Sequence, residues 1–492
     1  MCLYGMNSGG TSMAFHRTIT NKMKTMLSKR NRLICLLLFF VSGVHAQDSS
    51  FVLTEDEFVG LVRKYHPVVK QADIQVARAG AELQMARGSF DPSINAGLDR
   101  KSFDGKLYYS YFNPQVNIPT WYGVDIKAGV EEVIGNRVSP EATLGQTSYV
   151  GVKLTAANII FDKRRAVLTA ARSFVKQTEA ERALTVNDLI NDALSAYWNW
   201  VREYQSWQIM SAVVKVNEER LQFVRLEYEQ GARPAIDTTE VLAQLQNFYY
   251  QHDNAWMSFL NAGLELSNYL WLDNNQPLVW SEQIRPAAIE MAHMQQLPAI
   301  EELLAMTRSN HPKLRSVGYK IDILETDRRL KAISIFPKLS INANLLGKGY
   351  GVPDEVKTPL LQNNYKAGVD LSVPLFLREA RGAYRSATLK LNDARLTQDQ
   401  VLLQLENKVK SYYNDVVRTG RQVEIYEQAY NNYLRLLSGE RLRFETGESS
   451  LFLLNSRETK VLEAAQKLQE LKVKWNKSYV GLLWATGQLS SL

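Results

Sequence analysis

Side chains that often carry out chemistry are few in this sequence, and their spacing fits no known kind of catalytic or metal site. Beyond residue 46 the histidines are His66, His252, His293 and His311. His66 and His311 each stand directly before a proline, at matching positions of a repeat described below, which favours structural roles. The sequence contains no glycine-rich phosphate loop, metal-spaced histidine pair or serine nucleophile elbow. We therefore predict no catalytic residues, no cofactor-binding or metal site and no enzyme activity.

Neighbouring carboxylates and tryptophans have simpler interpretations than a reaction centre. Glu131-Glu132 and Glu218-Glu219 are adjacent pairs, but charged residues make up 22% of the chain, so such pairs are expected on solvated faces. Trp198, Trp200 and Trp207 follow one another at helical spacing, which favours packing over a ligand box.

The first 46 residues have the layout of a secretory signal peptide. A basic leader ends at Arg32, an apolar run extends from Leu33 to Val44, and small residues precede a cleavage site after Ala46. The translated start could equally be Met23 or Met26, and a signal anchor is the alternative.

Removing this leader changes the charge balance and the cysteine content. Six of the 58 basic residues and none of the 51 acidic residues lie in it, so 52 basic residues remain against 51 acidic ones. The net charge of +7 therefore gives no support for nucleic-acid binding. Cys2 and Cys35 also lie in the leader, so no disulfide or thiol nucleophile is expected in the mature chain.

No stretch of 18 apolar residues follows Ala46, which argues against a transmembrane helix in the mature chain. If the mature chain spans a membrane, it must do so with strands closed into a barrel, because lipid satisfies no free backbone group.

A tandem duplication organises the chain. His66-Pro67 and Pro92 recur 245 residues later as His311-Pro312 and Pro337. Further landmarks follow in the same order in both halves: Ser93–Leu98 with Ser340–Leu345, Gly151–Leu154 with Gly368–Leu371, and Arg225–Gly231 with Arg441–Gly447. We predict a first repeat over 47–275, a linker over 276–296 and a second repeat over 297–492.

Each repeat is expected to contain a helix, strands and a long helical hairpin. The first helix should begin at Thr54, with a capping box to Glu57, break at His66-Pro67 and stop at Gly88. The long helix is predicted between about 160 and 230, since no Gly or Pro occurs from Val152 to Gln230. At 1.5 Å per residue it would be about 100 Å long. Similar patterns predict long helices over 383–446 and returning helices over 237–271 and 451–484, so the tips should lie near 231–237 and 447–453.

Strands are expected near 90–155 and 337–375. Apolar and polar residues alternate through 94–99, 150–154 and 369–375. This pattern fits a membrane strand with lipid on one side, and equally a half-buried strand in a soluble sheet. The aromatic residues of 108–122 could form an interfacial girdle or a core. Residues 103–145 could be an extracellular loop or additional strands.

In these features the chain resembles the TolC-like outer-membrane efflux family over nearly its whole mature length. The resemblance rests on the duplication, on the helix starts after a strand and on the tip motifs: Phe161–Arg165, Phe376–Arg381, Tyr228–Gly231 and Phe444–Gly447.

The resemblance implies a mainly α fold with membrane β-strands, in which duplicated long α-helical hairpins form a coiled-coil tunnel and three protomers share one β-barrel. Each protomer of a homotrimer would contribute four of twelve strands. The strands would lie in the outer membrane of a Gram-negative-type envelope and the helices in the periplasm. Such a channel is a passive conduit that docks on a periplasmic adaptor protein and an inner-membrane pump, in tripartite efflux or type I secretion-like systems.

The resemblance also places the periplasmic entrance at the hairpin tips. Carried over by position, the tip residues are Gly231, Arg233, Asp237, Glu240, Phe444, Glu445, Gly447, Glu448, Leu453 and Ser456. Leu453 and Ser456 stand where the family has acidic residues, which suggests an apolar gate with charge from the first half. Asp237 and Glu240 could also form a capping box for the returning helix.

A second function class remains open from the residues themselves. The chain could be a soluble periplasmic coiled-coil scaffold or adaptor in which the alternating segments form a small soluble sheet. Adaptors usually carry one hairpin, however, whereas this chain has two full repeats.

Overall fold

The computed structural model describes residues 51–136, 143–289, 291, 297–350, 364–373 and 375–490. The expected signal peptide lies outside these residues. The described residues form two units. The smaller holds Phe51, Val52 and residues 283–285, from strands β1 (Phe51–Leu53) and β6 (Ile284–Pro286), which pair with each other. All features below belong to the larger unit.

Two broken helices precede the strands. Helices α2 (Glu55–Tyr65) and α3 (Pro67–Gly88) meet at His66, and helices α7 (Ile300–Asn310) and α8 (Pro312–Ile333) meet at His311. At each break the proline begins the second helix and the histidine caps it, its Nδ1 accepting a hydrogen bond from the backbone N–H two residues on. The predicted capping box of Thr54 and Glu57 is present, and α3 ends at Gly88 as predicted.

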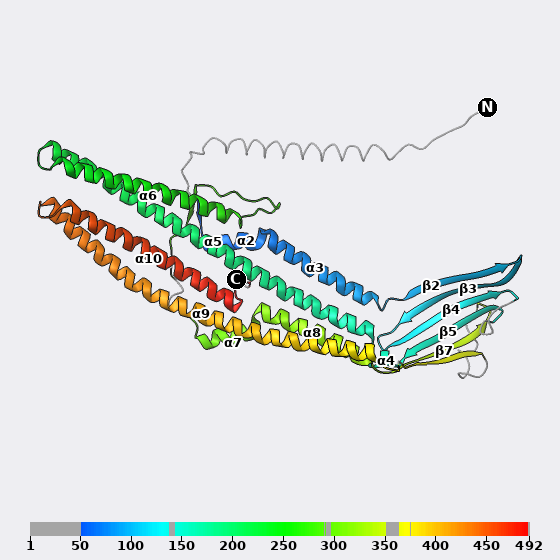
Figure 1. Ribbon diagram of the computed structural model, residues 1–492. Coiled ribbons are helices and arrows are strands. Elements are labelled where there is room, and N and C mark those ends of the chain that lie inside the picture. Colours follow the sequence, from blue (N-terminus) through cyan, green and yellow to red (C-terminus); the bar gives the residue numbers. More distant parts are fainter. Residues whose placement is uncertain are drawn as a thin grey trace, which may run out of the picture. The chain divides into compact units, whose positions relative to one another are not determined.

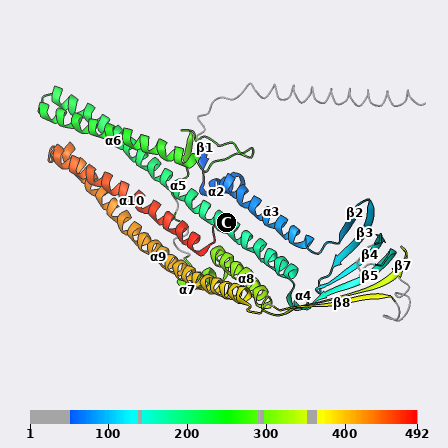
Figure 2. The same cartoon turned by 45° about the vertical axis from the view of Figure 1, so that its right-hand side comes forward.

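Two long helical hairpins form the largest part of the fold. The first pairs α5 (Lys163–Glu229) with α6 (Ala235–Ser267), after a short helix α4 (Ala156–Phe161). The second pairs α9 (Arg378–Glu445) with α10 (Leu451–Thr486), and both pairs run side by side in Figures 1 and 2. The 67 residues of α5 span about 100 Å at 1.5 Å per residue. The long helices predicted from the sequence are thus confirmed, and α6 ends four residues earlier than expected.

Aromatic packing holds the first hairpin together. Trp200 is fully buried and stacks on Phe259, with 6.2 Å between the ring centroids. Trp207 stacks on the same ring at 6.0 Å, and Trp198 is buried beside Tyr197. The interpretation of these tryptophans as packing residues is confirmed. Among the described residues, no helix is both long and apolar enough to cross a membrane.

A six-stranded antiparallel sheet lies between the broken helices and the long hairpins in the chain. Its order is β2 (Ser93–Phe103), β3 (Lys106–Pro119), β4 (Val124–Ile134), β5 (Gly145–Thr155), β7 (Lys338–Lys348) and β8 (Tyr365–Ser372). The open question about residues 103–145 is therefore answered: β3 and β4 are additional strands. The expectation of four strands in each chain is wrong, because this hairpin pairs with β2 on one side and β5 on the other.

The two faces of this sheet differ sharply in polarity. One row of register partners crosses all six strands with apolar or aromatic side chains: Ile94, Val116, Ala128, Val150, Leu345 and Tyr365. The next row, on the opposite face, contains Ser93, Asn117, Lys127, Gly151, Asn344 and Lys366. The apolar side is open to solvent in the isolated chain, with Ile94 82% and Val369 68% exposed. A sheet that exposes one apolar face is incomplete as a water-soluble structure.

The aromatic side chains of 108–122 lie in different environments, and their role as a girdle stays a prediction. Trp121 and Tyr122 are exposed in the turn between β3 and β4. Tyr111 instead lies on the polar face, where its hydroxyl donates a 3.0 Å hydrogen bond to Glu131.

Candidate functional site at the hairpin tips

Both hairpins turn through the same backbone motif. Gly231 and Gly447 follow the ends of α5 and α9 in the left-handed region, with φ of 73° and 77°. The N–H of Ala232 donates to the carbonyl of Glu227 at 2.9 Å, and the N–H of Glu448 donates to that of Arg443 at 2.8 Å. These bonds, which reach back five residues, define a Schellman ending, and glycine adopts the required conformation without strain.

Arg233 organises the first tip and reaches the second. Its guanidinium pairs with Glu227 of α5 and lies 3.5 Å from Asp237 of α6. It also lies over the ring of Phe444 in α9, 4.1 Å from the centroid, which is cation–π geometry. One side chain therefore connects both ends of the first tip to the other hairpin.

Asp237 and Glu240 do not form the capping box that was one of their two predicted roles. Helix α6 begins at Ala235 with Pro234 as its cap, and no side chain caps it. The helix starts two residues earlier than the capping box at Asp237 suggested. Pro234 has a restricted φ and no N–H to donate, so it can stand at the helix start and Ala235 begins the helix. Asp237 lies in the first turn, where it faces Arg233, and Glu240 turns toward α10.

An apolar cluster packs the two hairpins together near the tips. Its buried members come from all four helices: Leu221, Val224, Val241, Leu245, Phe444, Leu451 and Leu454. Phe444 thus belongs to this core and also takes part in the Arg233 contact through the face of its ring. Hydrophobic burial, which has no directional requirement, holds the tips close, and the polar contacts fix their orientation.

A polar network crosses from the first hairpin to the second within the same region. Arg220 of α5 makes a two-pronged ion pair with Glu458 of α10 and lies 3.3 Å from the Asn455 side-chain oxygen. The Asn455 amide donates to Glu240 of α6 at 3.1 Å. The side chains of Arg220 and Glu458 are only 9% and 13% exposed, so their charges compensate each other in a poorly solvated place.

The second tip is held mainly by its own residues. Glu445 pairs with Arg441 at 3.3 Å within α9, and both Glu445 and Glu448 are exposed. Leu453 is 42% exposed and Ser456 is exposed on the first turns of α10. Glu440, which is buried, accepts a hydrogen bond from Ser449 and lies 3.8 Å from Arg457.

The structure therefore brings together only some of the predicted tip residues. Arg233, Asp237 and Phe444 share one set of contacts, and Glu240 joins the network of Arg220, Asn455 and Glu458. Glu445, Glu448, Leu453 and Ser456 lie outside both sets in this chain.

Arg220, Asn455, Glu458 and Glu440 were not predicted from the sequence. A signal was present, because Arg220 lies within one helical turn of Leu221 and Val224, which are buried. Likewise Asn455 and Glu458 follow Leu451 and Leu454 at helical spacing and precede Leu462. A charge inside an apolar stripe of a coiled coil marks a specificity contact.

The three histidines among the described residues have structural partners, and His293 lies outside the described residues. His252 accepts a hydrogen bond from the Trp207 indole at 3.1 Å, and His66 and His311 are helix caps. Over the described ranges no group of three or more metal-ligating side chains occurs.

Comparison with solved structures gives the same fold in several bacterial channels. The Campylobacter jejuni CmeC outer membrane channel is 16% identical, with a TM-score of 0.60, covering 88% of this chain and 85% of that one. The open-state Neisseria gonorrhoeae MtrE outer membrane channel is 14% identical, with a TM-score of 0.63 over 88% and 89%. The Vibrio cholerae outer membrane protein VceC is 12% identical, with a TM-score of 0.61 over 88% and 96%. No curated protein matches the chain in sequence.

The family model of outer membrane efflux proteins matches residues 59–270 and 303–488. The two matched ranges contain the tips of both hairpins and all six strands of the sheet. Because this match covers most of the chain and repeats in its two halves, the chain belongs to the outer membrane efflux protein family and is an outer-membrane channel protein rather than an enzyme.

Proposed function

We propose that the chain is the outer-membrane conduit of a tripartite efflux or type I secretion-like system. Three copies form a passive channel from the periplasm to the exterior, and the hairpin tips dock on a periplasmic adaptor and an inner-membrane pump. The energy for transport comes from that pump. The observation that supports this most directly is the exposed apolar face of a sheet that continues into helices of about 100 Å.

The alternative of a soluble periplasmic scaffold fits these features poorly. A soluble sheet would cover its apolar face with other elements of the chain. Here Ile94, Leu98 and Val369 are each more than 60% exposed. Family membership points the same way.

We further infer that the tips form the periplasmic gate. The Arg220–Glu458 pair and the Asn455–Glu240 hydrogen bond tie the first hairpin to the second within one chain. Separating the hairpins breaks these contacts and exposes the apolar cluster beneath them, so the closed arrangement is the stable one without a partner. The apolar gate at Leu453, with charge from the first half, remains a prediction for the assembled channel.

Membrane fractionation combined with native mass spectrometry tests the proposed function. We expect the protein in the outer-membrane fraction, and after detergent extraction a trimer that dissociates on heating. Photocrosslinkers placed at the exposed Glu448 and at Leu453 should then capture a periplasmic adaptor in intact cells. A soluble periplasmic monomer would overturn the proposal.

A further inference from the structure

The β3–β4 hairpin sits in the middle of one half of the sheet rather than at its border. Strand β3 pairs with β2 along most of its length, and β4 pairs with β5 from Val124↔Leu154 to Val133↔Gly145. Among the described strands, β3 is the one that pairs with β2. These two strands are therefore an integral part of the sheet.

The apolar face continues through this hairpin from Val124 to Val130 of β4. Val124, Ile126 and Ala128 of β4 are register partners of Leu154, Val152 and Val150 of β5. Ile126 and Val152 are exposed, as are the apolar residues of β2 and β8 on the same face. The intervening Asp125, Lys127 and Glu131 point to the polar face. In a surface loop, the apolar residues would not be expected to align with those of the neighbouring strands on one face.

The strand lengths match a bilayer. Strands β3 and β4 have 14 and 11 residues, and β2, β5 and β7 have 11 each. A strand tilted by about 45° needs roughly 9–11 residues to cross the hydrocarbon core. The hairpin can therefore cross the same layer as the other strands.

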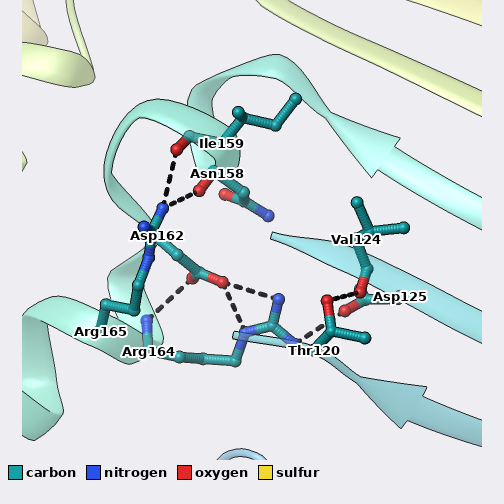
Figure 3. A network of polar contacts seen from close by, with 8 residues as sticks. All are labelled: Thr120, Val124, Asp125, Asn158, Ile159, Asp162, Arg164 and Arg165. Atoms are coloured by element: carbon teal, nitrogen blue, oxygen red, sulfur yellow. Dashed lines mark hydrogen bonds and ion pairs between the residues drawn. The ribbon is translucent and has the colours of Figure 1, made fainter. Parts of the chain in front are cut away.

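Side chains and backbone fix the base of the hairpin to the helices. Arg164, at the start of α5, pairs with Asp125 of β4 at 2.8 Å and with Asp162 at 2.7 Å (Figure 3). The neighbouring Arg165 binds the carbonyls of Asn158 and Ile159 in α4. These two arginines connect the base of the hairpin, α4 and the start of α5.

The turn between β3 and β4 packs against helix α4. Gly123 has φ of +80°, and a Cβ there would lie 2.5 Å from the Asn158 carbonyl oxygen, so only glycine fits. Trp121 stacks on Phe90, which follows α3, with centroids 5.3 Å apart. Contacts at its base therefore hold the hairpin against the helices.

We propose that the β3–β4 hairpin is part of the membrane wall, so that each copy of the chain contributes six strands, and its apolar face contacts lipid hydrocarbon. This inference rests on the proposed function. Within the described sheet, β2 and β8 each pair on one side only. With an even number of strands, β8 of one copy can join β2 of the next in antiparallel fashion, and three copies close a wall of eighteen strands.

The larger wall changes the exit of the channel. Barrel diameter grows roughly linearly with strand number, so eighteen strands give a barrel about 1.5 times as wide as twelve. Polar side chains from the hairpin, including Lys127, Glu131 and Asn113, then line the wider lumen.

Spin labels on β4 test whether the hairpin faces lipid. The chain has two cysteines, Cys2 and Cys35, and a background with both replaced by serine allows single labels at Ile126, Lys127, Ala128, Val130 and Glu131. In vesicles of phosphatidylethanolamine and phosphatidylglycerol, we expect oxygen accessibility to peak at 126, 128 and 130. Accessibility to a water-soluble nickel chelate should peak at 127 and 131.

Labels at Val369 and Asp370 of β8 serve as the matched reference, because these neighbours lie on opposite faces of a strand outside the hairpin. Alternation in both β4 and β8 supports the inference. Alternation in β8 with uniform water accessibility in β4 overturns it and leaves the proposed channel standing. Low accessibility of β4 to both reagents means that protein covers it, which also overturns it. Absence of alternation in both strands overturns the inference together with the proposed function.

Cysteine pairs test the closing edges. Asn95 of β2 would be combined in turn with Gly368 and Asp370 of β8, all on the polar face. We expect oxidation to link separate chains into covalent trimers for at least one pair. The pair of Asn95 with Val369, which lie on opposite faces, is the control and should stay unlinked. If no polar-face pair links the chains, this edge pairing is wrong.

Discussion

The geometry of single residues at the tips has measurable consequences, beginning with Gly231. Its φ of 73° is costly for a residue with a branched Cβ. No neighbouring atom lies within 4 Å of the position that a Cβ would take, so the effect comes from the backbone alone. We expect Gly231→Val to destabilise the tip by about 1–2 kcal/mol and to weaken adaptor crosslinking.

Two variants separate this backbone effect from side-chain size. Gly231→Asn should retain most function, because asparagine tolerates the left-handed region. Gly382→Val, within α9 and likewise without close neighbours, should have little effect. Equal behaviour of the valine and asparagine variants at position 231 in hydrogen exchange of the tip would contradict the backbone explanation.

Arg220 carries the strongest prediction at this scale. Removing one partner of a poorly solvated ion pair leaves the other charge uncompensated, which typically costs about 3–5 kcal/mol. Arg220→Gln should therefore loosen the contact between hairpins and raise the conductance of single channels in planar bilayers several-fold.

The double variant Arg220→Met/Glu458→Met should recover much of the stability, since neither charge then remains buried. Arg225→Gln, an exposed position one turn further along α5, is the matched control and should conduct like the unaltered protein. Unchanged conductance in Arg220→Gln would remove this pair from the gate.

At the scale of elements, His311 determines how one helix begins. It is 3% exposed, caps α8 and accepts a 3.1 Å hydrogen bond through Nδ1, which requires that nitrogen to be unprotonated. Burial, with help from Lys408 and Lys313, lowers the pKa of His311 from 6.5 to about 4. The repeat counterpart His66 has a lowered pKa for the same main reason, burial.

A histidine whose pKa falls on folding binds its proton more readily in the unfolded chain. The stability it supports is therefore complete above pH 6.5 and is lost as the pH falls toward 4, by up to about 3 kcal/mol. His311→Asn keeps a capping acceptor that does not titrate, so unfolding measured between pH 7 and 4 should depend less on pH. An identical pH dependence in the two proteins would contradict this assignment.

The long helices could be predicted from the sequence more fully than the strands could. The absence of Gly and Pro over a long span was enough to predict α5, because the hydrogen bonds of a helix are local. Strands β3 and β4 showed the right alternation, but their register partners lie up to 30 residues away in the chain, as for Val124 and Leu154. Alternation alone therefore left the choice between a loop and strands open.

At the scale of the whole molecule, the sheet must present an apolar surface to the membrane. Ala128 lies in the central apolar row on β4. A lysine on the lipid face near the bilayer midplane costs about 2–4 kcal/mol. We expect Ala128→Lys to reduce the amount of folded protein in the outer membrane and its resistance to urea.

Asn342→Lys, on the polar face of β7, is the matched control and should insert normally. Both variants introduce a lysine, on opposite faces of one sheet. If both variants insert equally well, the apolar face does not contact lipid.

Family membership and the location in the outer membrane follow from the whole chain rather than from any one motif. The match to outer membrane efflux proteins extends over both halves, and the solved channels share the fold at 12–16% identity. A fold can persist at such identity because cores accept many simultaneous substitutions that keep their volume and apolar pattern.

The sequence by itself determined the long helices, the breaks at His66 and His311, and the hairpin tips at Gly231 and Gly447. All of these depend on residues close together in the chain, where local backbone preferences act. Only the tertiary structure decided that β3 and β4 join the sheet, that Asp237 faces Arg233 instead of capping α6, and that Arg220, Asn455, Glu458 and Glu240 meet. These contacts join residues up to 238 positions apart, and their partners are set by how hairpins and strands pack together, which local patterns do not specify.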